Sequence, residues 1–361
     1  MNPNNYNVSV IGIAATYVGT VIGAGYASGQ EILQYFSYFR DKALFIAFIA
    51  TLLFFIFGYL PCYLAKHFST NNYLIAINPN KKRAFSIFCD IFITLSLFGT
   101  LVIMLSGAGT MFEEKFHLPM FVGALLVCIL LMLNTYIGLS FVVRVMEFMV
   151  PIMFVGVAIV GIYSLIYPSA SSQELANVSI NNSDLIPHWS MSGILYVAFN
   201  FQLALAVLVP LSQKAKDHKT LFFGILLGAI MLGGCAMFLY LVLEAHIVEI
   251  GTTKLPMIIL ANAISPYLGI FYALVLFFGL YSTAITCFYG SVERTRRFFF
   301  MRSTSSFVVI ILTAILGFFA SLLGFKDLIS IIYPVLGYGG IIIMCLILYT
   351  YFKEVIKAKN S

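Results

Sequence analysis

The chain has 361 residues, of which 61% are hydrophobic and 9% are charged, and its formal net charge is +6. A soluble domain typically carries about 25% charged residues, so this composition excludes a water-soluble enzyme and predicts a protein that faces lipid over most of its surface. The positive charge lies between apolar runs, as membrane topology signals do. We therefore expect a lipid bilayer, and not nucleic acid, as a partner.

Hydrophobic runs follow one another along the chain, and each is compared with the roughly 20 residues that cross a bilayer as a helix. About ten such runs predict an all-α integral membrane protein with one transmembrane domain, 1–361. The predicted spans are 8–37, 43–65, 84–111, 118–136, 142–167, 190–212, 220–246, 264–292, 303–324 and 328–352. Residues 247–263 are apolar but short and contain Pro256, so we expect a short external helix there and no further span.

The distribution of Lys and Arg predicts the orientation of the chain. Alternate loops and the C-terminus carry 15 of the 20 Lys and Arg residues, and the opposite loops carry the other 5. Positively charged loops remain in the cytoplasm, so we expect a multi-pass protein of the plasma membrane with both termini cytoplasmic. The clean alternation also favours an even number of spans.

Small residues cluster in the middle of the first predicted span, where residues 19–31 read GTVIGAGYASGQE. Glycine costs roughly 1 kcal/mol relative to alanine inside a helix, so the cluster predicts an unwound step near Gly23. Unwound backbone is tolerated at that depth only where it is buried in protein or lines a wet cavity, and there it can hold a substrate or a cation. Tight helix packing through small residues is the alternative explanation.

The sixth predicted span carries Asn200 and Gln202 at its middle, followed by Pro210. Midspan amides are costly unless they have partners, and proline leaves a carbonyl free one turn earlier, so we expect a second interruption here. An ordinary interhelical hydrogen bond from Asn200 is the alternative. The two interruptions open two five-span halves, 1–167 and 168–361, which predicts an inverted repeat with a midplane binding site.

Two segments resemble known transporters. The stretch GTVIGAGYASGQEI, residues 19–32, resembles the opening helix of the YkvI-like membrane proteins, which belong with the amino acid–polyamine–organocation transporters of the LeuT fold. It is also similar to the GNAVGLGN step of the neurotransmitter:sodium symporters, and FFGLYSTAI, residues 277–285, resembles the AGLTSS segment of their eighth helix. The resemblance implies a LeuT-like 5+5 inverted repeat with helices one and six broken.

The same resemblance implies two groups of site residues. Na⁺ would bind between helices one and eight, at the carbonyls of Gly19, Ile22 and Phe278 and the hydroxyl of Ser282, with Thr283 as a substitute where Tyr281 departs from the pattern. Substrate would bind at Gly23, Ala24, Gly25 and Asn200, with Ser106, Gly107 and Tyr281 as lining candidates. Hydrogen bonds from Ser282 and Thr283 to a carbonyl one turn earlier are the alternative explanation of those hydroxyls. Because no acidic residue is expected at the break, an amino acid or similar zwitterion fits better than a monoamine.

Ionisable residues inside the spans are functional candidates by default. Glu31 is expected about two turns beyond the glycine step, as a proton-coupling acid, an outer gate or a partner for a nearby polar group. Arg144 and Glu147 share a helix face through their i, i+3 spacing, as an inner gate or a structural interfacial pair. Glu244 and His246 near an outer end are candidates for ion or proton binding, or simply for interface polarity.

The sequence thus predicts a secondary active transporter of a small organic solute, which works by alternating access coupled to Na⁺ or H⁺. The alternative is a solute sensor, receptor or channel that retains the fold. No cofactor is expected apart from Na⁺ as a coupling ion, and no oligomeric state is predicted. The sequence contains no Ser-His-Asp, HExxH or phosphate-loop arrangement, so we do not expect an enzyme.

Overall fold

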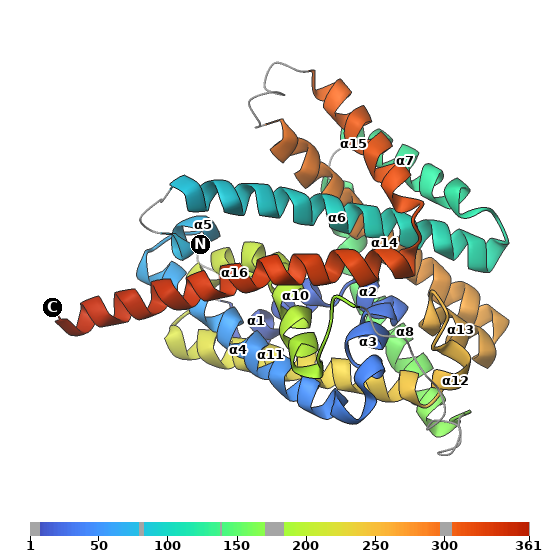
Figure 1. Cartoon of the computed structure of the whole chain (residues 1–361), viewed down its shortest axis with the longest axis horizontal. Helices are drawn as coiled ribbons and strands as arrows, with labels where there is room; N and C mark the ends of the chain where they lie inside the picture. The colour runs from blue at the N-terminus through green and yellow to red at the C-terminus, as the bar shows by residue number, and fades with distance from the viewer. Residues whose placement is uncertain (1–7, 79–82, 138, 170–183, 297–304, 361) are drawn as a thin grey trace, which may run out of the picture.

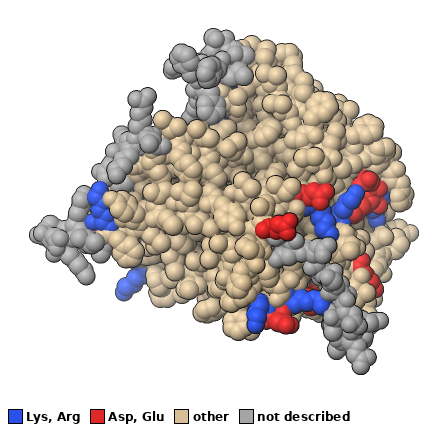
Figure 2. All heavy atoms as spheres, viewed as in Figure 1, with Lys and Arg blue, Asp and Glu red and all other residues tan. Residues whose placement is uncertain are grey.

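The structure, a computed structural model, describes residues 8–78, 83–137, 139–169, 184–296 and 305–360, and most of them are helical. Among these residues, six helices are long and apolar enough to cross a membrane, and four shorter apolar helices accompany them. Together they match the ten predicted spans in order. The all-α fold class is therefore confirmed. Many large apolar side chains are exposed, and most of the face in Figure 2 carries no charged side chain.

In chain order the helices are α1 (Val10–Val21), α2 (Ala24–Ser28), α3 (Gln30–Tyr35), the 3-10 helix η1 (Ser37–Lys42), α4 (Ala43–His67), α5 (Tyr73–Ile77), α6 (Arg83–Phe116), α7 (Met120–Ile137), α8 (Leu139–Ile166), α10 (Trp189–Gln213), α11 (His218–Glu244), α12 (Ile247–Ile250), α13 (Pro256–Ile264), α14 (Pro266–Thr295), α15 (Ser306–Ser321) and α16 (Phe325–Asn360). The first predicted span comprises α1, α2 and α3. The apolar segment after α11 forms only the short helices α12 and α13, as predicted.

The predicted break in the first span is confirmed. Helix α1 ends at Val21, and Ile22 and Gly23 have extended backbone conformations before α2 begins at Ala24. A second change of direction follows at Gly29, whose φ of 83° lies in the left-handed region that favours glycine. The first span is therefore a chain of three helical pieces, and every residue of α2 and α3 is buried.

The predicted interruption of the sixth span is wrong, because α10 runs from Trp189 to Gln213 as one helix. The midspan amides find partners without unwinding: Asn200 Nδ2 donates to the Tyr196 carbonyl at 3.0 Å, and Gln202 Nε2 donates to the Ala198 carbonyl at 3.0 Å. Gln202 Nε2 also donates to the Leu336 carbonyl of α16 at 2.9 Å. The Asn200 bond lies within α10, so it is not the interhelical bond given as the alternative, and of the two amides only Gln202 bonds to another helix in these contacts.

The helices pair in a way that an inverted five-plus-five repeat requires. Helix α1 packs against α11, and α10 packs against α4 (Figure 1). Helices α1 and α10 are the first helices of the two halves, and α4 and α11 are the second. Each pair therefore joins the first helix of one half to the second helix of the other, as the symmetry of the repeat requires. Helix α6 packs against α14, which are the third helices of the two halves.

Close approach of α10 and α16 gives a stability prediction. A Cβ at Gly340 would overlap the carbonyl oxygen of Ala198 and lie 2.8 Å from its carbonyl carbon, so backbone would have to move. We expect Gly340→Ala to destabilise the protein by about 1–3 kcal/mol through overpacking. Thermal unfolding in detergent measures the effect. The matched control is Gly234→Ala in α11, where a Cβ meets nothing within 4 Å, and an equal loss in both variants would contradict the prediction.

Candidate substrate and ion site

Two adjoining cavities meet at the break between α1 and α2. The larger one, the main cavity, has a volume of about 490 Å³, and the smaller one, the inner cavity, has a volume of about 70 Å³. Residues that line both cavities are Thr20, Gly23, Ala24, Ser96, Gln202, Leu203 and Thr283. The unwound backbone therefore faces open space on both sides, as expected for non-helical backbone at membrane depth.

The main cavity extends from the break toward one end of the molecule, where its lining includes Tyr73 and Arg294. Arg294 Nη2 donates to the Tyr73 hydroxyl at 3.1 Å across this mouth. The lining residues Ala206 and Thr286 are exposed, so the cavity is open on this side. On the face drawn in Figure 2, the end near the C-terminus shows Lys and Arg and no Asp or Glu, and we call it the basic end.

The inner cavity lies deeper and mixes polar with apolar side chains. Helix α6 contributes Ser96, Thr100 and Met104, and α10 contributes Phe199 and Asn200. The remaining lining side chains include Glu31 of α3 and Tyr333 of α16. The lining of the inner cavity comes from seven helices, α1, α2, α3, α6, α10, α14 and α16.

Glu31 does not lie two turns beyond the break as predicted. The turn at Gly29 folds α3 back, so a Cβ at Gly25 would overlap Glu31 Oε1 and would lie 3.0 Å from the Tyr333 hydroxyl. The carboxylate is 5% exposed and forms a hydrogen bond with the Tyr333 hydroxyl. The expectation that no acid lies at the break is therefore wrong, since this one reaches it from the following helix.

Four of the five residues predicted for Na⁺ line the main cavity: Gly19, Ile22, Ser282 and Thr283. The hydroxyls of Ser282 and Thr283 both donate to the Gly279 carbonyl, at 2.8 Å and 3.1 Å. A hydroxyl that donates one bond keeps lone pairs that can accept or bind a cation, so these bonds leave the predicted role open. Phe278 is not among the lining residues, and Gly279 takes that place.

The structure turns other predicted residues away from the cavities. The Tyr281 hydroxyl pairs with Asn134 of α7, and neither cavity includes its side chain. Ser106 is fully buried outside the cavities, and a Cβ at Gly107 would meet Phe325 and Leu280. The i, i+4 series from Ser96 through Thr100 to Met104 marks the cavity face of α6 and was the signal that sequence reasoning missed. The side chains of Arg144 and Glu147 lie outside the described residues.

Beyond the inner cavity a cluster of buried rings, the aromatic seal, closes the way to the opposite end. It consists of Tyr35, Phe36, Tyr196, Phe199 and Tyr333. Ring centroids lie 5.5 Å apart for Tyr35 and Phe199, 5.1 Å for Phe36 and Tyr196, and 4.3 Å for the stacked pair Phe199 and Tyr333. Each such pair contributes about 0.5–1.5 kcal/mol beyond its buried area. The two ends of the molecule therefore differ, with a cavity toward one and packed rings toward the other.

Ion pairs connect loops and helix ends on the side of the molecule closed by the aromatic seal. Lys254 and Glu113 form an ion pair at 2.6 Å between the loop that precedes α13 and the end of α6. Arg40 and Glu244 lie 3.6 Å apart. These contacts tie η1 to α11 and the loop before α13 to α6.

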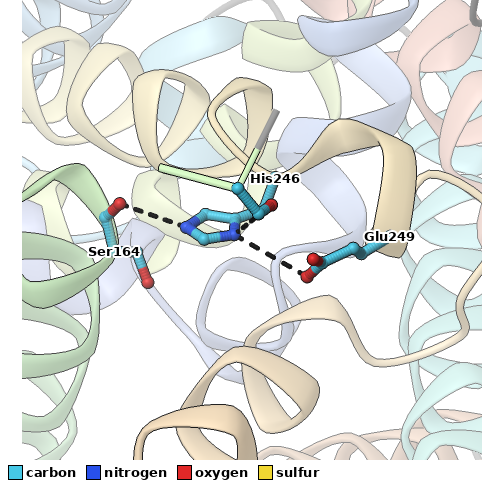
Figure 3. A network of polar contacts seen from close by, with 4 residues as sticks. Ser164, His246 and Glu249 are labelled. Carbon is cyan, nitrogen blue, oxygen red and sulfur yellow. Dashed lines mark hydrogen bonds and ion pairs between the residues drawn. The ribbon is translucent and has the colours of Figure 1, made fainter. Parts of the chain in front are cut away.

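His246 connects several segments at the sealed end of the molecule (Figure 3). Its Nε2 donates to the Ser164 carbonyl at 3.1 Å, which leaves Nδ1 to meet Ser169 Oγ at 2.8 Å and Glu249 Oε2 at 3.8 Å. The network links the end of α8 to the α11–α12 turn. It thus has a structural explanation, and neither cavity includes His246 or Glu244.

Comparison with known proteins supports this architecture. No family model matches the chain. The chain is 28% identical over 339 residues to the membrane protein YkvI of Bacillus subtilis (strain 168), an alignment that covers 90% of this chain and 91% of that protein. It is 25% identical over 341 residues to the protein YyaD of the same bacterium, with 92% and 94% covered.

Three solved structures share the fold. They are a variant of the Eremococcus coleocola manganese transporter (TM-score 0.61, 14% identity, 97% of this chain and 80% of that chain), the inward-facing conformation of Mhp1 (0.61, 13%, 98% and 80%) and MhsT in complex with L-phenylalanine (0.59, 16%, 92% and 87%). At these identities the likeness concerns the fold. The chain is an integral membrane protein with the fold of LeuT-type transporters.

Proposed function

We propose that this chain is a secondary active transporter of a small organic solute, an amino acid or a related compound. The observation that carries the proposal is the unwound step at Ile22 and Gly23, where Gly23 lines both cavities and Ile22 lines the main cavity. Broken helices at a midplane site are typical of secondary transporters with this repeat. The similar solved structures include a manganese transporter, a nucleobase–cation symporter and a protein bound to L-phenylalanine, which supports a transporter of some small solute.

In this proposal the structure corresponds to an inward-facing state. The basic end faces the cytoplasm of a cell whose plasma membrane holds the protein, in keeping with the partition of Lys and Arg. The main cavity then opens to the cytoplasm, and the aromatic seal closes the external side. Transport requires α1, α4, α10 and α11 to move against the helices packed around α6 and α14, so that the seal parts and the main cavity closes.

Uptake into proteoliposomes tests the proposal. Purified protein is reconstituted and offered a panel of radiolabelled amino acids, amines and carboxylic acids, with Na⁺ and pH gradients imposed separately. Accumulation of at least one solute above its external concentration supports a coupled transporter. Binding without accumulation favours a sensor, and equilibration without accumulation under either gradient favours a channel.

We further propose that Na⁺ is the coupling ion and that it binds between α1 and α14. Gly19, Ile22, Ser282 and Thr283 line one cavity, and the end of α1 leaves its last carbonyls without intrahelical N–H partners. Hydroxyl and carbonyl oxygens are the ligands that a hard cation prefers. Accumulation driven by a pH gradient alone, with no response to Na⁺, would contradict this assignment.

Ser282→Ala tests the cation site. We expect this variant to weaken the Na⁺ stimulation of uptake by about tenfold, because it removes one oxygen ligand while leaving the helix intact. The Na⁺ concentration that gives half-maximal uptake is the measurement. Ser321→Ala is the matched control, since the Ser321 hydroxyl also donates to a carbonyl three residues earlier, at 2.7 Å, but lies outside both cavities. Equal Na⁺ responses in the two variants would remove Ser282 from the site.

A further inference from the structure

Glu31 is the one carboxylate that lines the inner cavity, and the described lining includes no Lys, Arg or His. Its helix α3 is wholly buried. Other titratable groups that face the Glu31 carboxylate are tyrosines: Tyr333 of α16, Tyr35 of α3, Tyr196 of α10 and Tyr26 of α2. The described surroundings thus supply one hydroxyl hydrogen bond and no cation.

A carboxylate in such a place needs a compensating positive charge or a proton, because an isolated buried charge is strongly unfavourable. The Glu31 side chain is buried, but it still lines the inner cavity and is held in position there. Because Gly25 has no side chain, there is room beside it for Glu31 Oε1, which a Cβ at this position would overlap. The Tyr333 hydroxyl forms a hydrogen bond with the same carboxylate. This arrangement leaves the carboxylate directed at a cavity that is large enough for a few atoms.

The rest of the inner cavity suits a protonated amine. The stacked rings of Phe199 and Tyr333 both line it, and aromatic faces attract cations. Thr20 and Thr100 add hydroxyl oxygens that can accept N–H bonds. Asn200 uses its Nδ2 to donate to Tyr196, so its amide oxygen takes no part in that bond. The lining therefore brings a carboxylate, hydroxyl groups, an amide and aromatic rings to the same small volume.

The volumes of the two cavities indicate which part of a ligand each can hold. About 70 Å³ accommodates a compact head group, and the main cavity of about 490 Å³ accommodates the remainder. The two spaces share Thr20, Gly23 and Gln202, so a ligand can extend from one into the other past the break. The lining of the main cavity is mainly apolar, with Leu97, Leu203 and Val207 among its residues.

We propose that the substrate carries a protonated amine, which enters the inner cavity and pairs with Glu31, and a mainly apolar body that occupies the main cavity. This inference rests on the proposed transport function and narrows the substrate class to compounds with a protonated amino group, namely amines and amino acids. Glu31 is then a substrate-binding residue. A carboxylate on the substrate is not needed for recognition.

Matched sets of compounds test the proposal by isothermal titration calorimetry with the purified full-length protein. Each set contains an amino acid, the amine that lacks its carboxylate and the acid that lacks its amino group: leucine, 3-methylbutylamine and 4-methylpentanoate; phenylalanine, 2-phenylethylamine and 3-phenylpropanoate. We expect at least one amine to bind and its paired acid not to bind. Glu31→Gln, which keeps the size of the side chain, should weaken amine binding by about tenfold or more, because a charge-assisted pair is lost.

Glu249→Gln is the control, since Glu249 lies outside both cavities, and it should leave amine affinity unchanged. The proposal is overturned if no amine binds, if the acids bind as tightly as the amines, or if Glu31→Gln binds amines like the wild type. The last result, combined with loss of uptake driven by a pH gradient, would make Glu31 a proton carrier. Accumulation of a deaminated acid in proteoliposomes would overturn this substrate class while leaving the transport function standing.

Discussion

Replacing Gly25 with alanine should abolish uptake. The new methyl group would take the position of Glu31 Oε1 and would crowd the Tyr333 hydroxyl, so the carboxylate and α3 have to shift. Overpacking of this kind costs about 1–3 kcal/mol, which corresponds to about a fivefold to 150-fold loss of affinity when it acts on the binding conformation. Initial rates of uptake into proteoliposomes, at matched amounts of reconstituted protein, measure the effect.

A double substitution separates steric damage from loss of the carboxylate. Gly25→Ala with Glu31→Ala removes the overlap, so we expect its thermal stability to recover relative to Gly25→Ala while uptake remains absent. Gly234→Ala on the lipid-facing side of α11 should transport like the wild type, because its methyl group meets nothing within 4 Å. Near-normal uptake by Gly25→Ala would show that the carboxylate is not held over the break.

Replacing Gly23 with leucine should block uptake by a different route, without unfolding the protein. The backbone of Gly23 is extended, with φ −121° and ψ −162°, a conformation that any residue adopts, and a Cβ there meets nothing within 4 Å. The larger side chain therefore enters space that both cavities share and occupies the place of the substrate. We expect uptake at background level with an unchanged thermal unfolding midpoint.

Gly23→Ala provides the graded comparison, with a smaller volume in the same place and a partial loss of uptake. If Gly23→Leu transports at the wild-type rate, the break is not part of the substrate path. If Gly23→Leu unfolds, the space beside Gly23 is needed for packing instead of binding. Gly25→Ala is thus expected to lower stability and Gly23→Leu to leave it unchanged, whereas both should lose uptake.

Sequence patterns predicted the features that depend on composition along the chain. The ten spans follow from apolar runs, and the break near Gly23 follows from clustered glycines that weaken a helix. The interruption at Asn200 was mispredicted because the cost of a buried amide depends on whether a carbonyl lies within reach. In α10 that carbonyl belongs to the same helix, one turn earlier.

The position of Glu31 depends on a single backbone dihedral. A straight helix through Gly29 would carry this side chain away from the break, whereas the left-handed φ of Gly29 returns it to Gly25. No periodicity in the sequence encodes that turn. The same limitation applies to Tyr281, because its side-chain direction is set by the neighbouring Asn134 of α7 and not by the motif around it.

The aromatic seal has a thermodynamic consequence for the proposed cycle. Opening the sealed end exposes to water rings that are now fully or almost fully buried, such as Tyr35, Phe36 and Tyr196. Exposure of apolar surface carries a positive heat-capacity change, so the free energy of this step varies with temperature along a curve. Hydrophobic stabilisation weakens on cooling, so lower temperature favours parting of the rings. In the proposed cycle the population of the outward-open state therefore depends on temperature as well as on substrate.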